Sequence, residues 1–185
     1  MATEVMKRLI NVDEYYKMAE VGILKPGDRV ELINGEIYEM SPIGNKHYSA
    51  VNKVSNFLKE VLLKSVIVSV QNPIRINEGN EPEPDICLLK PRSDFYADQF
   101  PGPNDALLII EVADSSLQFD RDVKSVTYAL AGIPDYWVIN LKENVLEIYS
   151  DPEKGRYRTS SVKNKDSKVS LSFIDMEIPV SEIMI

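Results

Sequence analysis

Apolar and polar positions along the chain fall into blocks, and the block at residues 106–113 is the most distinctive. It reads Ala-Leu-Leu-Ile-Ile-Glu-Val-Ala, an unbroken apolar run into which one carboxylate is set. A short run of this kind predicts a strand that is buried on both faces. Glu111 would then sit at or near the end of a central strand, where burial of its charge needs a compensating cation or donor. The alternative is that Glu111 lies just past the strand and is solvated, or pairs with a nearby lysine or arginine.

The other blocks predict an alternation of helices and strands. Periodic apolar positions predict helices, β-branched or alternating runs predict strands, and Asn34-Gly35 predicts a two-residue hairpin turn. The expected helices cover residues 11–21, 46–64 and 120–131. The expected strands cover residues 29–33, 36–40, 66–70, 84–89, 106–113, 135–140, 145–150, 156–160 and 169–173, with 73–76 as an edge-like extension and 90–105 as a long loop. This order predicts an α/β (α+β) fold with a mixed β-sheet flanked by helices.

Composition adds limits to this picture. A chain of 185 residues with 44% hydrophobic and 27% charged residues fits a single domain spanning residues 1–185. No apolar run is long enough to cross a membrane, and residues 1–8 lack the apolar core of a signal peptide. Cys87 is the only cysteine and His47 the only histidine, which argues against disulfides and closed zinc sites. We therefore expect a cytoplasmic protein that does not associate with membranes.

The formal net charge of −8 bears on possible partners. Proteins that bind nucleic acid usually carry a basic surface, so any such surface in this chain must be local. A bound divalent metal ion would supply positive charge at one site.

Three residues form the best candidate for chemistry. On neighbouring strands, Asp85 and Glu111 would place two carboxylates at one end of the sheet, a ligand set suited to Mg²⁺ or Mn²⁺. Lys124, on the following helix, could orient a water molecule or stabilise charge in the transition state. Each residue also has a structural interpretation, because Asp120 and Lys124 have the spacing of a helical ion pair, and Asp85 could cap backbone donors. His47, near the start of a helix, fits better a partly buried, hydrogen-bonded histidine with a structural role.

Six short motifs, in order, resemble the Uma-two family of bacterial proteins, which is assigned to the PD-(D/E)xK restriction-endonuclease-like superfamily. They are Glu31-Leu32-Ile33-Asn34-Gly35-Glu36, His47 on a helix, Glu81-Pro82-Glu83-Pro84-Asp85, Ile110-Glu111-Val112-Ala113-Asp114-Ser115-Ser116, Asp120–Lys124 with Tyr128-Ala129, and Gly132-Ile133-Pro134-Asp135-Tyr136-Trp137.

The resemblance implies a restriction-endonuclease-like core in which Asp85 and Glu111 are the two site acids and hold the metal. It also implies that Glu36 and His47 lie near the site. The position two after Glu111, where the superfamily has lysine, is Ala113, and Lys124 would restore the missing lysine.

The leading interpretation is a metal-dependent endonuclease that uses Mg²⁺ or Mn²⁺ to hydrolyse phosphodiester bonds, with DNA as the expected substrate and a homodimer as a plausible assembly. Glu36 would add a ligand or a water-mediated contact. The first alternative is a nuclease fold that no longer cuts and serves as a binding or assembly module. The second is a hydrolase of small phosphorylated molecules, which a pocket closed by residues 90–105 would favour.

Overall fold

A six-stranded sheet forms the centre of the molecule, in the strand order β3-β4-β5-β6-β7-β8. The computed structural model describes residues 6–185, so residues 1–5 of the expected domain and of the N-terminal segment lie outside the described part. The sheet strands are β3 (Ile67–Val70), β4 (Ile86–Leu89), β5 (Ala106–Ala113), β6 (Asp135–Asn140), β7 (Val145–Glu153) and β8 (Arg156–Lys163). Only β5 and β6 pair in parallel, and the other neighbours are antiparallel. The mixed sheet predicted from the sequence is confirmed.

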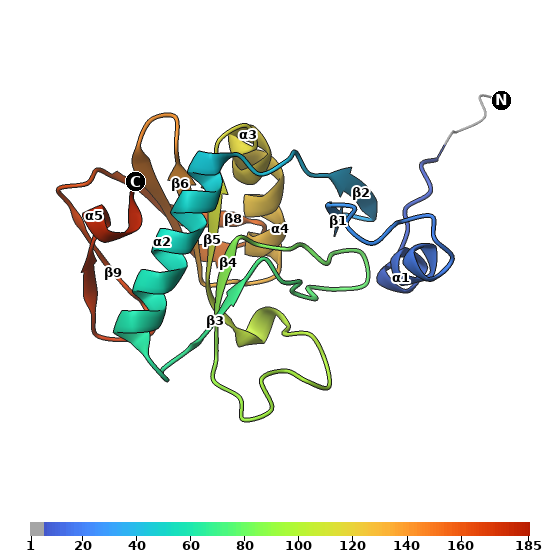
Figure 1. Ribbon diagram of the computed structural model, residues 1–185, viewed down its shortest axis with the longest axis horizontal. Coiled ribbons are helices and arrows are strands. Elements are labelled where there is room, and N and C mark those ends of the chain that lie inside the picture. Colours follow the sequence, from blue (N-terminus) through green and yellow to red (C-terminus); the bar gives the residue numbers. More distant parts are fainter. Residues whose placement is uncertain (1–5) are drawn as a thin grey trace.

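Helices cover both faces of this sheet (Figure 1). The helical segments are α1 (Val12–Glu20), α2 (Asn45–Leu62), α3 (Leu117–Phe119), a π-helical turn (Asp120–Lys124), α4 (Ser125–Leu130) and α5 (Val180–Ile183), with a 3₁₀ turn at Pro103–Asp105. One core lies between the sheet and α2 with α5, and a second, rich in tyrosine, lies on the α4 side. Within the described residues, no helix combines the length and apolar character needed to cross a membrane.

Strand alternation explains how one short strand serves both cores. In β4, Ile86 and Leu88 belong to the core under α2, while Cys87 and Leu89 belong to the core on the α4 side. All of β4 is buried, as expected for a central strand whose side chains alternate between two covered faces. The start of β4 is therefore held rigidly, and so is Asp85, the residue that precedes it.

A small N-terminal unit sits at one end of the molecule, opposite the C-terminus (Figure 1). Strands β1 (Val30–Ile33) and β2 (Glu36–Glu39) form the predicted hairpin, and Asn34 and Gly35 adopt the left-handed φ angles of 53° and 73° that its turn requires. The hairpin docks on the 77–83 segment, where the Glu81 backbone N–H donates to the Leu32 carbonyl at 2.8 Å. This contact carries Glu31 toward the central sheet.

The strand predicted at 169–173 ends at Ser170, and two other predicted elements differ more. Residues 73–76 do not extend the sheet, because Gln71 adopts a φ of 50° and turns the chain away from β3. The Ile74 backbone N–H bonds instead to the Pro82 carbonyl at 3.0 Å. The predicted helix at 120–131 begins earlier, at Leu117, and passes through the π-helical turn. The remaining short pair, β9 (Lys168–Ser170) with β10 (Glu177–Pro179), packs beside α5.

Candidate active site

A cavity of about 610 Å³ lies where the β1–β2 hairpin, the start of α2, the ends of β3 and β5 and the π-helical turn meet. Its lining includes Asp85, Glu111, Lys124 and His47. These residues lie far apart in the sequence, and the strand pairing of β4 with β5 brings the first two together. The cavity is therefore the place in the fold where most of the predicted site residues converge.

Asp85 is a buried residue of the cavity lining, and both of its carboxylate oxygens contact hydrogen-bonding groups of the surrounding protein. Its Oδ2 lies 2.9 Å from His47 Nε2 and accepts the Val112 backbone N–H at 2.9 Å. Its Oδ1 accepts from Gln71 Nε2 at 3.1 Å. Burial alone would raise the pKa of Asp85, but the hydrogen bond and charge of His47, together with the other donors, lower it. Asp85 is thus held as a carboxylate, in which form it can serve as a ligand or a base.

Glu111 lies beside Asp85 and is tied to a buried lysine. Its Oε2 accepts the Asp85 backbone N–H at 3.3 Å, and its Oε1 accepts from Lys124 Nζ at 3.0 Å and from the Tyr128 hydroxyl at 2.9 Å. Lys124 Nζ also donates to Glu31 Oε1 at 3.1 Å. The sequence left open whether Glu111 is solvated or buried, and the structure buries it with a cation.

The buried side chains around Lys124 include more acidic than basic groups. Burial raises the pKa of Glu111 well above its ordinary value, although the charge of Lys124 opposes that rise. Burial would lower the pKa of Lys124, but the charges of Glu111, Glu31 and Asp120 outweigh it and raise that pKa. One ammonium therefore faces several buried carboxylates, and an additional cation would be favourable here.

The π-helical turn determines where Lys124 points. A π-helical turn shifts the register of the side chains that follow it, and such turns are frequent at functional sites. Arg121 anchors the turn through a two-pronged contact with Glu147, in which Nε donates to Oε2 at 2.9 Å and Nη2 to Oε1 at 2.5 Å. The Tyr136 hydroxyl donates to the Asp120 carbonyl at 3.1 Å. Lys124 consequently pairs with Glu31 and Glu111, at 3.0 Å each, and not with Asp120 as the helical spacing allowed.

Four of the five predicted site residues come together in this cavity, namely Asp85, Glu111, Lys124 and His47. Glu36 does not line it, because its carboxylate pairs with Lys7 and accepts from the Tyr38 hydroxyl at 2.8 Å. In the hairpin register Glu36 lies opposite Ile33 at the turn, whereas Tyr38 lies opposite Glu31. The hairpin thus presents Glu31 to the site in place of Glu36.

Sequence reasoning missed Glu31 and Asp120 as residues of this cavity. Both are buried, with exposed fractions of 3% and 2%. Asp120 accepts from the Ser116 hydroxyl at 2.7 Å, and burial raises its pKa. Glu31 opens one of the six family motifs and stands directly before the apolar pair Leu32-Ile33, but neither feature assigned it to the site. Asp120 was expected only as a helical partner of Lys124.

The donor set suits a hard divalent cation. Asp85 and Glu111 both line the cavity, and the Glu111 carboxylate reaches the Asp85 backbone N–H at 3.3 Å. Mg²⁺ is commonly held by one or two carboxylates, with water and substrate phosphate completing its shell. Among residues 6–185, no group of three or more His, Cys, Asp or Glu side chains is arranged to hold a metal ion. The protein therefore offers a two-carboxylate site and no complete cage.

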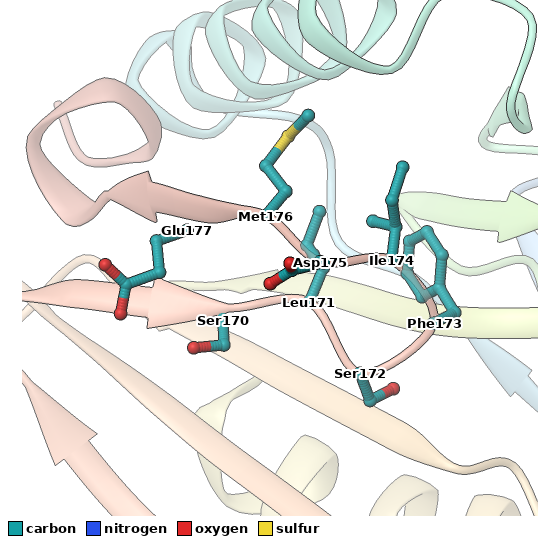
Figure 2. A pocket seen from close by; sticks show the side chains of 8 residues that line it. All are labelled: Ser170, Leu171, Ser172, Phe173, Ile174, Asp175, Met176 and Glu177. Carbon is teal, nitrogen blue, oxygen red and sulfur yellow. The ribbon is translucent and has the colours of Figure 1, made fainter.

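Two other hollows lie outside this group of residues. One, of about 450 Å³, is lined only by the turn between β9 and β10, where Figure 2 shows the side chains of Ser170–Glu177. Phe173, Ile174 and Met176 of this turn pack against the core under α2, which gives the turn a structural role. The other, of about 590 Å³, is lined by Arg75 and residues of the 96–105 loop. The long loop therefore forms a separate cavity and does not close the site.

Comparisons with known proteins agree with this fold. The Uma2 family, described as "Putative restriction endonuclease", matches residues 12–181. Among solved structures, a "putative nuclease belonging to DUF820" from Anabaena variabilis is similar, with a TM-score of 0.69 and 15% sequence identity over 94% of this chain and 97% of that one. A comparison with curated proteins finds no match. The architecture expected from the six motifs, a restriction-endonuclease-like mixed sheet flanked by helices, is confirmed.

Proposed function

This chain belongs to the Uma2 family, and from that premise we propose that it is a metal-dependent endonuclease that hydrolyses phosphodiester bonds in DNA. The observation that carries the proposal is the buried pair Asp85 and Glu111 with Lys124 Nζ 3.0 Å from Glu111 Oε1. Two carboxylates in one cavity can hold a divalent ion that assists hydrolysis of a phosphate ester, and a lysine beside them can stabilise the negative charge that develops.

Each residue has a role that follows from its contacts. Asp85 and Glu111 would hold Mg²⁺ or Mn²⁺, which when bound polarises a phosphoryl oxygen and acidifies a water molecule. His47 and the Val112 N–H orient the Asp85 carboxylate through their 2.9 Å contacts with Oδ2. Lys124 carries its charge beside the reacting phosphate and stabilises the negative charge that develops there. Tyr128 fixes the rotamer of Glu111 through its 2.9 Å hydrogen bond.

Hydrolysis of a small phosphorylated molecule is the second candidate, and the charge of the cavity favours it. Seven carboxylates line the cavity, against the two fixed cations Arg29 and Lys124; they are Glu31, Glu39, Glu83, Asp85, Glu111, Asp114 and Asp120. A long polyanion lying across such a surface would be repelled, whereas a ligand with one phosphate would need only the charge of the bound ion.

The test is metal-dependent cleavage of DNA by purified protein. With Mn²⁺ or Mg²⁺ present, we expect nicking or cleavage that stops on addition of a chelator. Asp85→Asn, Glu111→Gln and Lys124→Met should each reduce the rate by roughly 100-fold or more, the usual effect of removing an electrostatic group from a reaction centre. Glu60→Gln, an exposed carboxylate near the end of α2, should cleave at the unaltered rate.

Cleavage that survives the Asp85→Asn and Glu111→Gln substitutions would contradict the proposal, because it would locate the activity elsewhere. Release of inorganic phosphate from small phosphate esters, without cleavage of DNA, would support the second candidate instead. Metal binding without hydrolysis of either substrate would support a nuclease fold that acts as a binding module.

A further inference from the structure

The cavity holds unused hydrogen-bonding capacity. Among the buried side-chain polar atoms of the described residues, two lack a hydrogen-bond partner, Glu31 Oε2 and His47 Nδ1, and both residues line this cavity. Lys124 Nζ lies 3.0 Å from Glu31 Oε2, but its hydrogen bonds go to Glu31 Oε1 and Glu111 Oε1. Buried polar atoms in folded proteins are nearly always paired. Glu31 Oε2 is thus already ion-paired with Lys124, and the ring nitrogen Nδ1 of His47 is the buried polar atom that the fold leaves without a partner.

One wall of the cavity is apolar and aromatic. Tyr38 on β2 and Phe119 on α3 pack with ring centroids 4.7 Å apart, and both line the cavity together with Met40, Pro42 and Ile43. Both rings are partly exposed, so each can still accept a flat partner. The buried charged residues Asp85, Glu111 and Lys124 belong to the same lining. This lining suits a ligand that combines a flat apolar part with a group that binds a metal ion.

The depth and charge of the site limit how a nucleic acid could enter it. The side chains of Asp85 and Glu111 are only 11% and 4% exposed, so a phosphate must come into the cavity to reach them. The cavity of about 610 Å³ is within the usual range for a site that encloses one small ligand. A duplex also brings many phosphates at once, and the seven acidic side chains of the lining oppose that charge.

We propose that this site takes one unpaired nucleotide, with its phosphate on the divalent ion that Asp85 and Glu111 would hold and its base stacked against the wall formed by Tyr38 and Phe119. This inference rests on the proposed function, since the phosphate would be held through the same metal ion. The ring nitrogen Nδ1 of His47, which has no hydrogen-bond partner, provides a polar contact for the sugar or the base edge. The substrate is therefore a single strand, or a free nucleotide, and not an intact duplex.

The test is binding, measured with Mn²⁺ present, of three probes: a single-stranded oligonucleotide that contains 2-aminopurine, the duplex of the same sequence, and a nucleoside monophosphate. Stacking quenches 2-aminopurine fluorescence, so the signal reports the base contact directly. We expect the single strand to bind more tightly than the duplex and its fluorescence to fall. Competition by the monophosphate at an affinity close to that of the oligonucleotide would identify a free nucleotide as the ligand, and weak competition would identify a strand.

A substitution in the aromatic wall tests whether base stacking contributes to binding. Phe119→Leu should weaken binding of the single strand about 5- to 150-fold, the range found when one base–aromatic contact is removed. Phe95→Leu is the matched control, because Phe95 is an exposed phenylalanine outside the cavity, with 74% of its surface exposed, and its substitution should have no effect.

The proposal is overturned if the duplex binds as tightly as the single strand, if no probe binds, or if Phe119→Leu binds like the unaltered protein while remaining folded by circular dichroism. Its failure is distinguishable from failure of the proposed function. Metal-dependent cleavage of duplex DNA that needs Asp85 and Glu111 would support the nuclease proposal and contradict only the proposal that the site takes an unpaired nucleotide.

Discussion

Lys124→Met tests whether the buried lysine is the charge that holds the site together. Lys124 is 1% exposed, and its two partners, Glu31 and Glu111, are each 3% exposed. Methionine has a similar length but no charge, so the substitution leaves both carboxylates buried without a cation. Removing one partner of a buried ion pair typically destabilises a protein by about 3–5 kcal/mol. For a chain of this size, that corresponds to a fall in Tm of roughly 6–20 °C.

The loss should also depend on pH, with a sign that follows from Glu111. Burial raises the pKa of Glu111 in the folded protein, and removal of Lys124 raises it further. The folded state of the variant then binds more protons than its unfolded state, so the stability of the variant falls as pH rises. The gap between the variant and the unaltered protein should therefore widen as pH rises through the already raised pKa of Glu111 toward the still higher pKa in the variant.

Thermal and urea unfolding of both proteins, followed by circular dichroism, measures this gap. The matched control is Lys168→Met. It removes the exposed ion pair between Lys168 Nζ and Glu177 Oε2, which are 4.0 Å apart, and should change stability by less than about 1 kcal/mol. Glu31→Gln should recover part of the loss in the Lys124→Met background, because it removes one of the unpaired charges. If Lys124→Met unfolds at the same temperature as Lys168→Met at alkaline pH, Lys124 is not the charge that balances these carboxylates.

Three further predictions concern neighbouring residues. Asp120→Asn should stabilise the protein at alkaline pH by on the order of 1 kcal/mol and have little effect near pH 4, because burial raises the pKa of Asp120 and its ionised form is therefore disfavoured; urea unfolding across pH checks this. Gly35→Ala should destabilise by about 1–3 kcal/mol in thermal unfolding, since φ is 73° and the added Cβ would lie 2.6 Å from Leu9 Cβ. Glu36→Gln should leave Mn²⁺ affinity unchanged in calorimetry, because Glu36 pairs with Lys7 outside the cavity.

Local pattern was sufficient to predict most of the sheet. The apolar run at 106–113 is the central strand β5, and Asn34-Gly35 forms the turn of the hairpin, because both signals depend on neighbouring residues only. The prediction that residues 73–76 extend the sheet was wrong, for a reason that the sequence does not reveal. A left-handed φ at Gln71, a residue type with no special preference for it, ends β3 and redirects the chain.

The site was predictable only in part because its contacts span long separations. Asp85 and Glu111 follow from the strand assignments and the family motifs, but the partner of Lys124 at Glu31 is 93 positions away. The alternative of a local Asp120–Lys124 pair assumed an α-helix, and the π-helical turn removes that geometry. Glu36 was expected near the site from its motif, and the hairpin register places Glu31 there instead.

Titration of the protein with Mn²⁺ by calorimetry tests the central claim most directly, because it needs no knowledge of the substrate. The account predicts binding of at least one ion to the unaltered protein, loss of that binding in Asp85→Asn and in Glu111→Gln, and unchanged binding in Glu60→Gln. Saturation at about 100 times the dissociation constant should stabilise the unaltered protein by about 2.7 kcal/mol. Absence of binding, both alone and with oligonucleotide present, or equal binding by the two carboxylate variants, would contradict a metal-dependent nuclease site at Asp85 and Glu111.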